Sequence, residues 1–196
     1  MFCLSVLKSA DVIFVVDKSW NVKMHDWRKV LRFLEKSIIE LSIEKNDVRV
    51  GIVTFDSYSM IWFPLHKYST ERILRQLNDI SYHAGITLTY AALNLVEQDL
   101  HVKHRVGRKQ IALVMLGGPS SYFGGRNGFF LTRRAAMRLH DAGVHVVAVG
   151  VSYKTDPAEL KAIASYPKLQ NVIQLGSFDQ LTEASKYILG MTPRGN

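Results

Sequence analysis

The side chains best suited to chemistry lie in a run of five residues that directly follows the first apolar stretch of the chain. The run reads Asp17-Lys18-Ser19-Trp20-Asn21. In an extended turn, side chains two residues apart can converge on one point, so the first, third and fifth would meet while Lys18 and Trp20 face away. One carboxylate with neutral oxygens is the kind of ligand set that holds a hard cation such as Mg²⁺.

The same residues also have a purely structural interpretation. Asp17 and Ser19 can hydrogen-bond the backbone amides of the turn, as such side chains do in loops. Thr87 can be the N-cap of the helix that it precedes. Trp20 is then either an exposed interface anchor or packs against aromatic residues of another loop. The residues alone leave these alternatives open.

The elements that must position these residues alternate between strands and helices. Apolar runs predict strands over residues 11–16, 48–55, 59–65, 111–116, 144–151 and 171–175. Apolar spacing and end signals predict helices over residues 24–41, 69–77, 87–100, 129–142, 156–165 and 177–189. This alternation predicts an α/β fold with a doubly wound (Rossmann-like), mainly parallel six-stranded sheet and helices on both faces.

Single residues mark where these elements end. Pro64 cannot donate to a sheet ladder, so its strand is predicted to be the one antiparallel strand, at an edge. Ser69 can cap a helix, and Pro157 suits the first turn of another. Gly143 suits the left-handed position after a helix. Met24 is predicted to begin the apolar face of the first helix.

Three segments follow one another in an order that is specific as a set. They are the Asp17 turn, the loop Gly85-Ile86-Thr87 and the stretch Ile111-Ala112-Leu113-Val114-Met115-Leu116-Gly117-Gly118. This order resembles the von Willebrand factor A domain, in the form found in type VI collagen, matrilins and cochlin. The resemblance implies a metal-ion-dependent adhesion site made of an Asp-x-Ser-x-Ser turn, a Thr from a second loop and an Asp from a third.

Carried over residue by residue, the resemblance implies a degenerate metal site. Asp17 and Ser19 match the first two positions, and Thr87 matches the second loop. Asn21 stands where the last Ser is usual. Gly117 stands where the third-loop Asp is expected, so one carboxylate is missing. We therefore expect no cofactor, with Mg²⁺ or another divalent cation as the alternative.

The bulk composition suits one globular domain of 196 residues, with 47% hydrophobic and 21% charged residues. The predicted organisation is a lead-in over residues 1–10, an A-type domain over 11–191 and a loose tail over 192–196. No stretch reaches the length of a membrane span, so membrane insertion is not expected. Cys3 is the one cysteine, and it is either a free thiol or pairs outside the chain.

The formal net charge of +8 suits an anionic partner. The predicted polyanion-binding residues are Lys103, Arg105, Arg108 and Lys109 in a loop and Arg134 and Arg138 on a helix. We expect these cations to lack acidic neighbours, and the resemblance implies a heparan-type glycosaminoglycan as their ligand. Nucleic acid is not expected, because no groove-entering helix or basic motif with interleaved aromatic residues is evident.

Aromatic residues and histidines complete the set of predicted contacts. Trp20, Tyr122 and Phe123 are predicted to contact a protein partner, the last two from a glycine-rich loop. A histidine pair among cations, three residues apart and without an acidic neighbour, does not predict a zinc site. His145 lies in an apolar strand and is predicted to be a hydrogen-bonded core residue.

Patterns for catalysis are absent from the sequence. No glycine-rich phosphate cradle follows the first strand, and residues 150–154 lack the second glycine of a nucleophile elbow. With the resemblance, this predicts a secreted, non-enzymatic adhesion or scaffold module of the extracellular matrix. Its expected partners are matrix proteins, collagen or a glycosaminoglycan, without a metal bridge. The alternatives are a divalent-cation-dependent domain using Asp17, Ser19 and Thr87, and an intracellular domain that binds nucleic acid.

Overall fold

A six-stranded sheet forms the centre of the computed structural model, which describes residues 9–122, 124–125 and 127–190. Its spatial order is β3-β2-β1-β4-β5-β6. The strands are β1 (Ser9–Asp17), β2 (Asp47–Phe55), β3 (Ser59–His66), β4 (Lys109–Leu116), β5 (His145–Gly150) and β6 (Val172–Gln174). Every neighbouring pair is parallel except β2 and β3, which are antiparallel.

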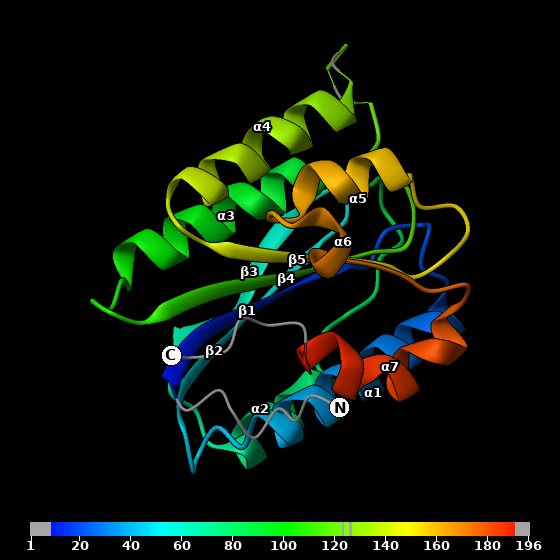
Figure 1. Cartoon of the computed structure of the whole chain (residues 1–196). Helices are drawn as coiled ribbons and strands as arrows, with labels where there is room; N and C mark the ends of the chain where they lie inside the picture. Colours follow the sequence, from blue (N-terminus) through cyan, green and yellow to red (C-terminus); the bar gives the residue numbers. More distant parts are fainter. Residues whose placement is uncertain (1–8, 123, 126, 191–196) are drawn as a thin grey trace.

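Helices cover both faces of this sheet (Figure 1). One face carries α3 (Thr89–Val102), α4 (Gly128–Asp141), α5 (Pro157–Ile163) and α6 (Lys168–Asn171). The other carries α1 (Met24–Leu41), α2 (Thr70–Leu77), the 3₁₀ turn η2 (Phe178–Gln180) and α7 (Leu181–Gly190). The predicted doubly wound fold is therefore confirmed. Among the described residues, no helix is long and apolar enough to cross a membrane.

The central strand β1 is buried on both faces. Val12, Phe14 and Val16 belong to the core under α1 and α7, while Ile13 and Val15 belong to the core under α3, α4 and α5. Successive side chains of a strand point to opposite faces. A continuous apolar run is therefore what a parallel strand covered on both sides requires.

The predicted end signals are confirmed at three helices. At the start of α2, the Ser69 Oγ accepts a hydrogen bond from the Arg72 N–H. Pro157 opens α5. Gly143 follows α4 with a φ of +77°, the left-handed conformation that glycine adopts without strain.

The prediction for Pro64 is also confirmed, whereas that for Met24 is wrong. Pro64 lies in β3, the antiparallel edge strand, where a missing N–H costs no ladder hydrogen bond. Met24 is 57% exposed. At this end of α1, Val22 and Trp27 make the contacts with the core, and the side chain of Met24 lies outside the core.

A cluster of ion pairs ties the loop before β4 to the start of the sheet. Asp11 of β1 is fully buried. Arg49 donates to its carboxylate through Nε at 2.8 Å and Nη2 at 2.7 Å. Arg105 donates from Nε to the same carboxylate at 3.0 Å and from Nη1 to Asp47 at 2.7 Å. Because a buried carboxylate needs compensating partners, this cluster holds the loop against β1 and β2.

Replacing Asp11 should therefore cost much more stability than breaking a surface pair. We expect Asp11→Ala to lower the free energy of unfolding by about 3–5 kcal/mol, because two guanidinium groups lose their buried counter-ion. Glu71→Ala, which breaks the exposed pair with Arg75, should cost less than about 1 kcal/mol. Urea denaturation followed by circular dichroism measures both, and equal losses would contradict the importance of the cluster.

Candidate functional site

The residues predicted for a metal site meet at one end of the sheet. The loops after β1, β2, β4 and β5 leave the sheet at the carboxyl ends of their strands, and we call this end the strand-end face (right side of Figure 1). From the neighbouring strands β1 and β4, the chain continues into helices on opposite faces, α1 and α4. Ligand sites of doubly wound sheets lie where connections diverge in this way.

Asp17 joins two of these loops through its carboxylate. It is 1% exposed. Its Oδ1 accepts the Ser19 N–H at 2.8 Å, and its Oδ2 accepts the Gly117 N–H at 2.9 Å. Burial raises the pKa of Asp17 to about 6, although these hydrogen bonds act to lower it. Both carboxylate oxygens are therefore committed to backbone donors.

The other three predicted ligands form a closed hydrogen-bond network beside Asp17. The Thr87 hydroxyl donates to the Ser19 Oγ at 2.9 Å. The Asn21 Nδ2 donates to the Thr87 Oγ1 at 2.9 Å, and the Asn21 N–H donates to the Ser19 Oγ at 3.3 Å. Asn21 thus directs donors, not oxygens, at its neighbours. The alternative role of Thr87 as an N-cap is wrong, because Leu88 precedes α3.

Two glycines of the third loop make room for this network. A Cβ on Gly118 would lie 2.4 Å from the Asn21 side chain, so this amide rests directly on the glycine backbone. A Cβ on Gly117 would lie 2.7 Å from a methyl group of Val22 and 3.3 Å from the Phe178 ring. The space of the missing carboxylate is therefore taken up by apolar packing. As arranged, these oxygens do not fit a hard cation.

Asp56 is a buried carboxylate next to the site that the sequence analysis missed. It directly follows β2, as the Asp17 turn follows β1, and that parallel is the signal that could have found it. Its Oδ2 lies 3.4 Å from the Lys18 Nζ. The ammonium group also lies 3.2 Å from the carbonyl of Ser81 and 3.2 Å from the Nδ1 of His83. Lys18 therefore holds the segment before α3 and points away from Asp17, as predicted.

Glu159 of α5, which the sequence analysis also missed, holds the loop after β4 through a hydrogen bond. It is 1% exposed, and its Oε2 accepts the Ser120 N–H at 3.0 Å. The Ser120 Oγ in turn lies 2.7 Å from the Thr89 Oγ1 and 3.0 Å from the Thr132 Oγ1. Burial raises the pKa of Glu159. One residue further on, the Ser121 Oγ accepts the Thr87 N–H at 3.0 Å.

The predicted contact aromatics lie on the strand-end face. Trp20 is 62% exposed and Tyr122 is 71% exposed, whereas Phe123 lies outside the described residues. Two more aromatic side chains on this face were missed: Tyr58 in the loop after β2 and Tyr153 in the loop after β5. Each of these four loops therefore presents an exposed aromatic ring.

The expectation that the basic segments lack acidic neighbours is wrong. Four of the predicted cations pair with carboxylates: Lys103 with Asp99, Arg105 with Asp11 and Asp47, Arg108 with Asp47, and Arg138 with Glu97. Asp99 precedes Lys103 by four residues and was visible in the sequence, whereas Asp11, Asp47 and Glu97 are brought in from distant parts of β1, β2 and α3. Arg134 is exposed on α4, and Lys109 begins β4. Polyanion binding stays a prediction.

His145 matches its prediction as a hydrogen-bonded core residue only in part, because Asn171 hydrogen-bonds its imidazole but the residue lies at the start of a strand. It is the first residue of β5 and is only partly buried. Its Nε2 has no hydrogen-bond partner in the described part of the chain. Burial lowers the pKa of this imidazole, and the charges of Lys109 and His140 lower it further.

The raised pKa of Glu159 predicts a pH-dependent stability. The folded protein holds this proton more tightly than the unfolded chain, so the stabilisation is full below the ordinary carboxyl pKa and declines as pH rises through the raised value. Glu159→Gln cannot ionise, so its stability relative to the unmodified protein should be greater at pH 7.5 than at pH 4. Thermal unfolding at both pH values measures this, with the exposed Glu183→Gln as control. A pH-independent difference would refute the expectation.

Restoring the missing carboxylate tests whether charge is what disables metal binding. We expect Gly117→Asp to raise Mg²⁺ affinity roughly tenfold, since ligand charge governs the affinity of hard cations. The new side chain needs the space of the Val22 methyl group, so the gain should be larger in a Val22→Ala background. Calorimetry measures the affinity, and Gly117→Asn controls for volume without charge. If neither Gly117→Asp nor the Gly117→Asp, Val22→Ala double variant gains affinity while staying folded, then loop geometry and not the missing charge prevents metal binding.

The sequence of this chain is similar to parts of known matrix proteins. Human vitrin is 30% identical over 176 residues, which cover 89% of this chain and 25% of vitrin. The collagen alpha-6(VI) chain of Mus musculus is 28% identical over 181 residues, which cover 92% of this chain and 8% of the collagen chain. The chain thus spans about a quarter or less of the length of these two relatives.

Solved structures show the same fold. Proximal thread matrix protein 1 from the mussel byssus has a TM-score of 0.81 at 21% identity, over 93% of this chain and 48% of that protein. Another structure of that protein has zinc in its metal-ion-dependent adhesion site (MIDAS) motif, and its TM-score is 0.80. The family match covers residues 11–186, nearly the whole described chain. The chain therefore belongs to the von Willebrand factor type A domain family.

Proposed function

We propose that this chain is a non-enzymatic adhesion module of a secreted extracellular matrix protein, and that it binds collagen through the strand-end face without a metal bridge. The observation that carries the proposal is the combination of a closed polar centre with exposed aromatic rings around it. These rings belong to Trp20, Tyr58, Tyr122 and Tyr153, each from a different loop. Exposed aromatic residues are the commonest anchors of protein interfaces.

The hydrogen bonds of the centre support recognition without metal. A divalent cation would have to displace the backbone donors from Asp17 and turn the Asn21 amide around. It would meet one carboxylate, whose raised pKa already reflects the cost of burying its charge. The backbone N–H groups therefore stabilise the Asp17 carboxylate, which a cation does in an intact site.

The relatives support the matrix setting. Several are collagen chains, and one structural neighbour is a matrix protein. Vitrin and the collagens are much longer than this chain, so the module would act as one part of a larger assembly. We carry over from them the matrix setting, and collagen is our own choice of partner within it.

Removing single aromatic side chains tests the proposal. On immobilised native type I and type VI collagen, Trp20→Ala and Tyr153→Ala should each weaken binding by about 10- to 100-fold, the loss typical of an interface anchor. Tyr166→Ala is a matched control for Tyr153→Ala, because both tyrosines are 85% exposed while Tyr166 lies near the start of β6, at the other end of the sheet. It should change binding less than twofold, as measured by surface plasmon resonance.

The same assay separates this function from metal-dependent capture. We expect equal affinity in Mg²⁺ and in EDTA. Loss of binding in EDTA would favour the alternative in which Asp17, Ser19 and Thr87 hold a cation. Failure to bind either collagen, or equal losses at Tyr153 and Tyr166, would overturn the proposal.

A further inference from the structure

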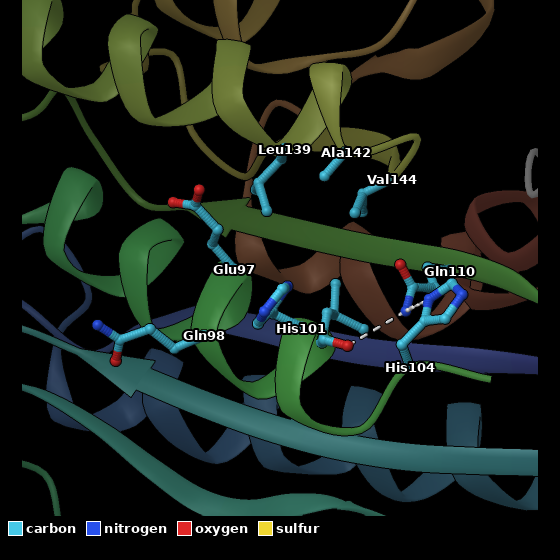
Figure 2. A pocket seen from close by; sticks show the side chains of 9 residues that line it. Glu97, Gln98, His101, His104, Gln110, Leu139, Ala142 and Val144 are labelled. Carbon is cyan, nitrogen blue, oxygen red and sulfur yellow. Dashed lines mark hydrogen bonds between the residues drawn. The ribbon is translucent and has the colours of Figure 1, made fainter.

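A groove lies at the opposite end of the molecule, where the strands begin. Between the ends of α3 and α4 is a hollow of about 460 Å³, with Leu100, Leu139 and Val144 among its apolar lining residues (Figure 2). A second hollow of about 440 Å³ shares His104 and Gln110 with the first and continues toward β5. We call the two hollows together the strand-start groove.

The side chains along this groove carry an excess of positive charge. Arg108, Lys109, His104 and His145 line the second hollow. Among the described residues that line either hollow, Glu97 is the one carboxylate, and Arg138 donates to it at 2.8 Å.

Two arginines at the rim of the groove form ion pairs with Asp47, and Arg108 is the more exposed of the two. Its guanidinium lies 3.3 Å from Asp47, whose carboxylate is shared with Arg105 at 2.7 Å. The Arg108 side chain is 43% exposed, against 23% for Arg105. Asp47 would therefore keep a partner if Arg108 turned to a ligand.

A hydrogen bond links Gln110 and His104 within the groove. The Gln110 Nε2 lies 3.4 Å from the Leu100 carbonyl and 3.4 Å from the His104 Nδ1 (Figure 2). When the His104 Nδ1 accepts this hydrogen bond, its Nε2 is the ring atom that can donate to a ligand. Among the described residues, the Nε2 of His145 has no hydrogen-bond partner.

We infer that the strand-start groove binds a sulfated glycosaminoglycan segment, with Arg108 and His104 contacting sulfate groups and Gln98 and Gln110 contacting sugar hydroxyls. Charge complementarity selects an anionic chain, and the amide side chains suit a polyhydroxylated one. Among the described residues, no Trp, Tyr or Phe lines the groove, so they do not provide the stacking platform that single-stranded nucleic acids use. This contact is at the end opposite the proposed collagen surface and does not depend on it.

The test compares neutral replacements of Arg108, of His104 and of a control lysine. Calorimetry with a heparin octasaccharide should show Arg108→Gln weakening binding roughly tenfold and His104→Gln roughly threefold. Lys154→Gln, at the exposed Lys154 on the strand-end face, should change it less than twofold. Circular dichroism checks folding, which Arg108→Gln should preserve because Asp47 keeps Arg105.

Four results would overturn this inference. The first is no binding of the octasaccharide by the unmodified chain at physiological salt. The second is an equal loss for Arg108→Gln and Lys154→Gln, because the protein would then be sensing only net charge. The third is tighter binding of a single-stranded DNA oligonucleotide than of the octasaccharide, which would make nucleic acid the better ligand. Binding of a desulfated octasaccharide with unchanged affinity would likewise contradict the role of Arg108.

Discussion

The buried carboxylate of Asp17 is the constraint on which the strand-end face depends. It has no cationic side chain as a partner in the described structure, and it is held instead by the N–H groups of Ser19 and Gly117. Because desolvation of the charge is only partly offset, the pKa rises to about 6. The two loops can satisfy this carboxylate only in one arrangement, which in turn places Thr87 and Asn21 against Ser19.

The two ends of the sheet solve the problem of a buried acid differently. At the strand-start end, Asp11 is enclosed by the guanidinium groups of Arg49 and Arg105, and the result is a locked loop. At the strand-end face, Asp17 is held by hydrogen bonds from backbone amides in place of ion pairs, and these bonds join the loops after β1 and β4. The surface proposed to bind collagen and the groove proposed to bind a glycosaminoglycan lie at opposite ends of this sheet, so together they would let one module join two matrix components.

Much of the site could be predicted because its residues form a recognisable local pattern in the sequence. Asp17, Ser19 and Asn21 follow an apolar strand at alternate positions, and the glycine in place of an acid is visible at position 117. Asp56 and Glu159 escaped notice because each is a single acid whose importance comes from burial next to another loop. The orientation of the Asn21 amide, which presents its Nδ2 to the Thr87 hydroxyl, is likewise a property of the assembled loops.

The sequence by itself determined the order of elements, because apolar runs and helical spacing are periodicities of the chain, and it determined that one carboxylate is missing. Pro64 was enough to put β3 at an edge, since a residue without an N–H is excluded from the interior of a sheet. Only the tertiary structure decided which charges are free. Arg105 and Arg138 resemble exposed cations in the sequence, yet their acidic partners are more than 40 residues away along the chain and meet them only when β1, β2, α3 and α4 pack together.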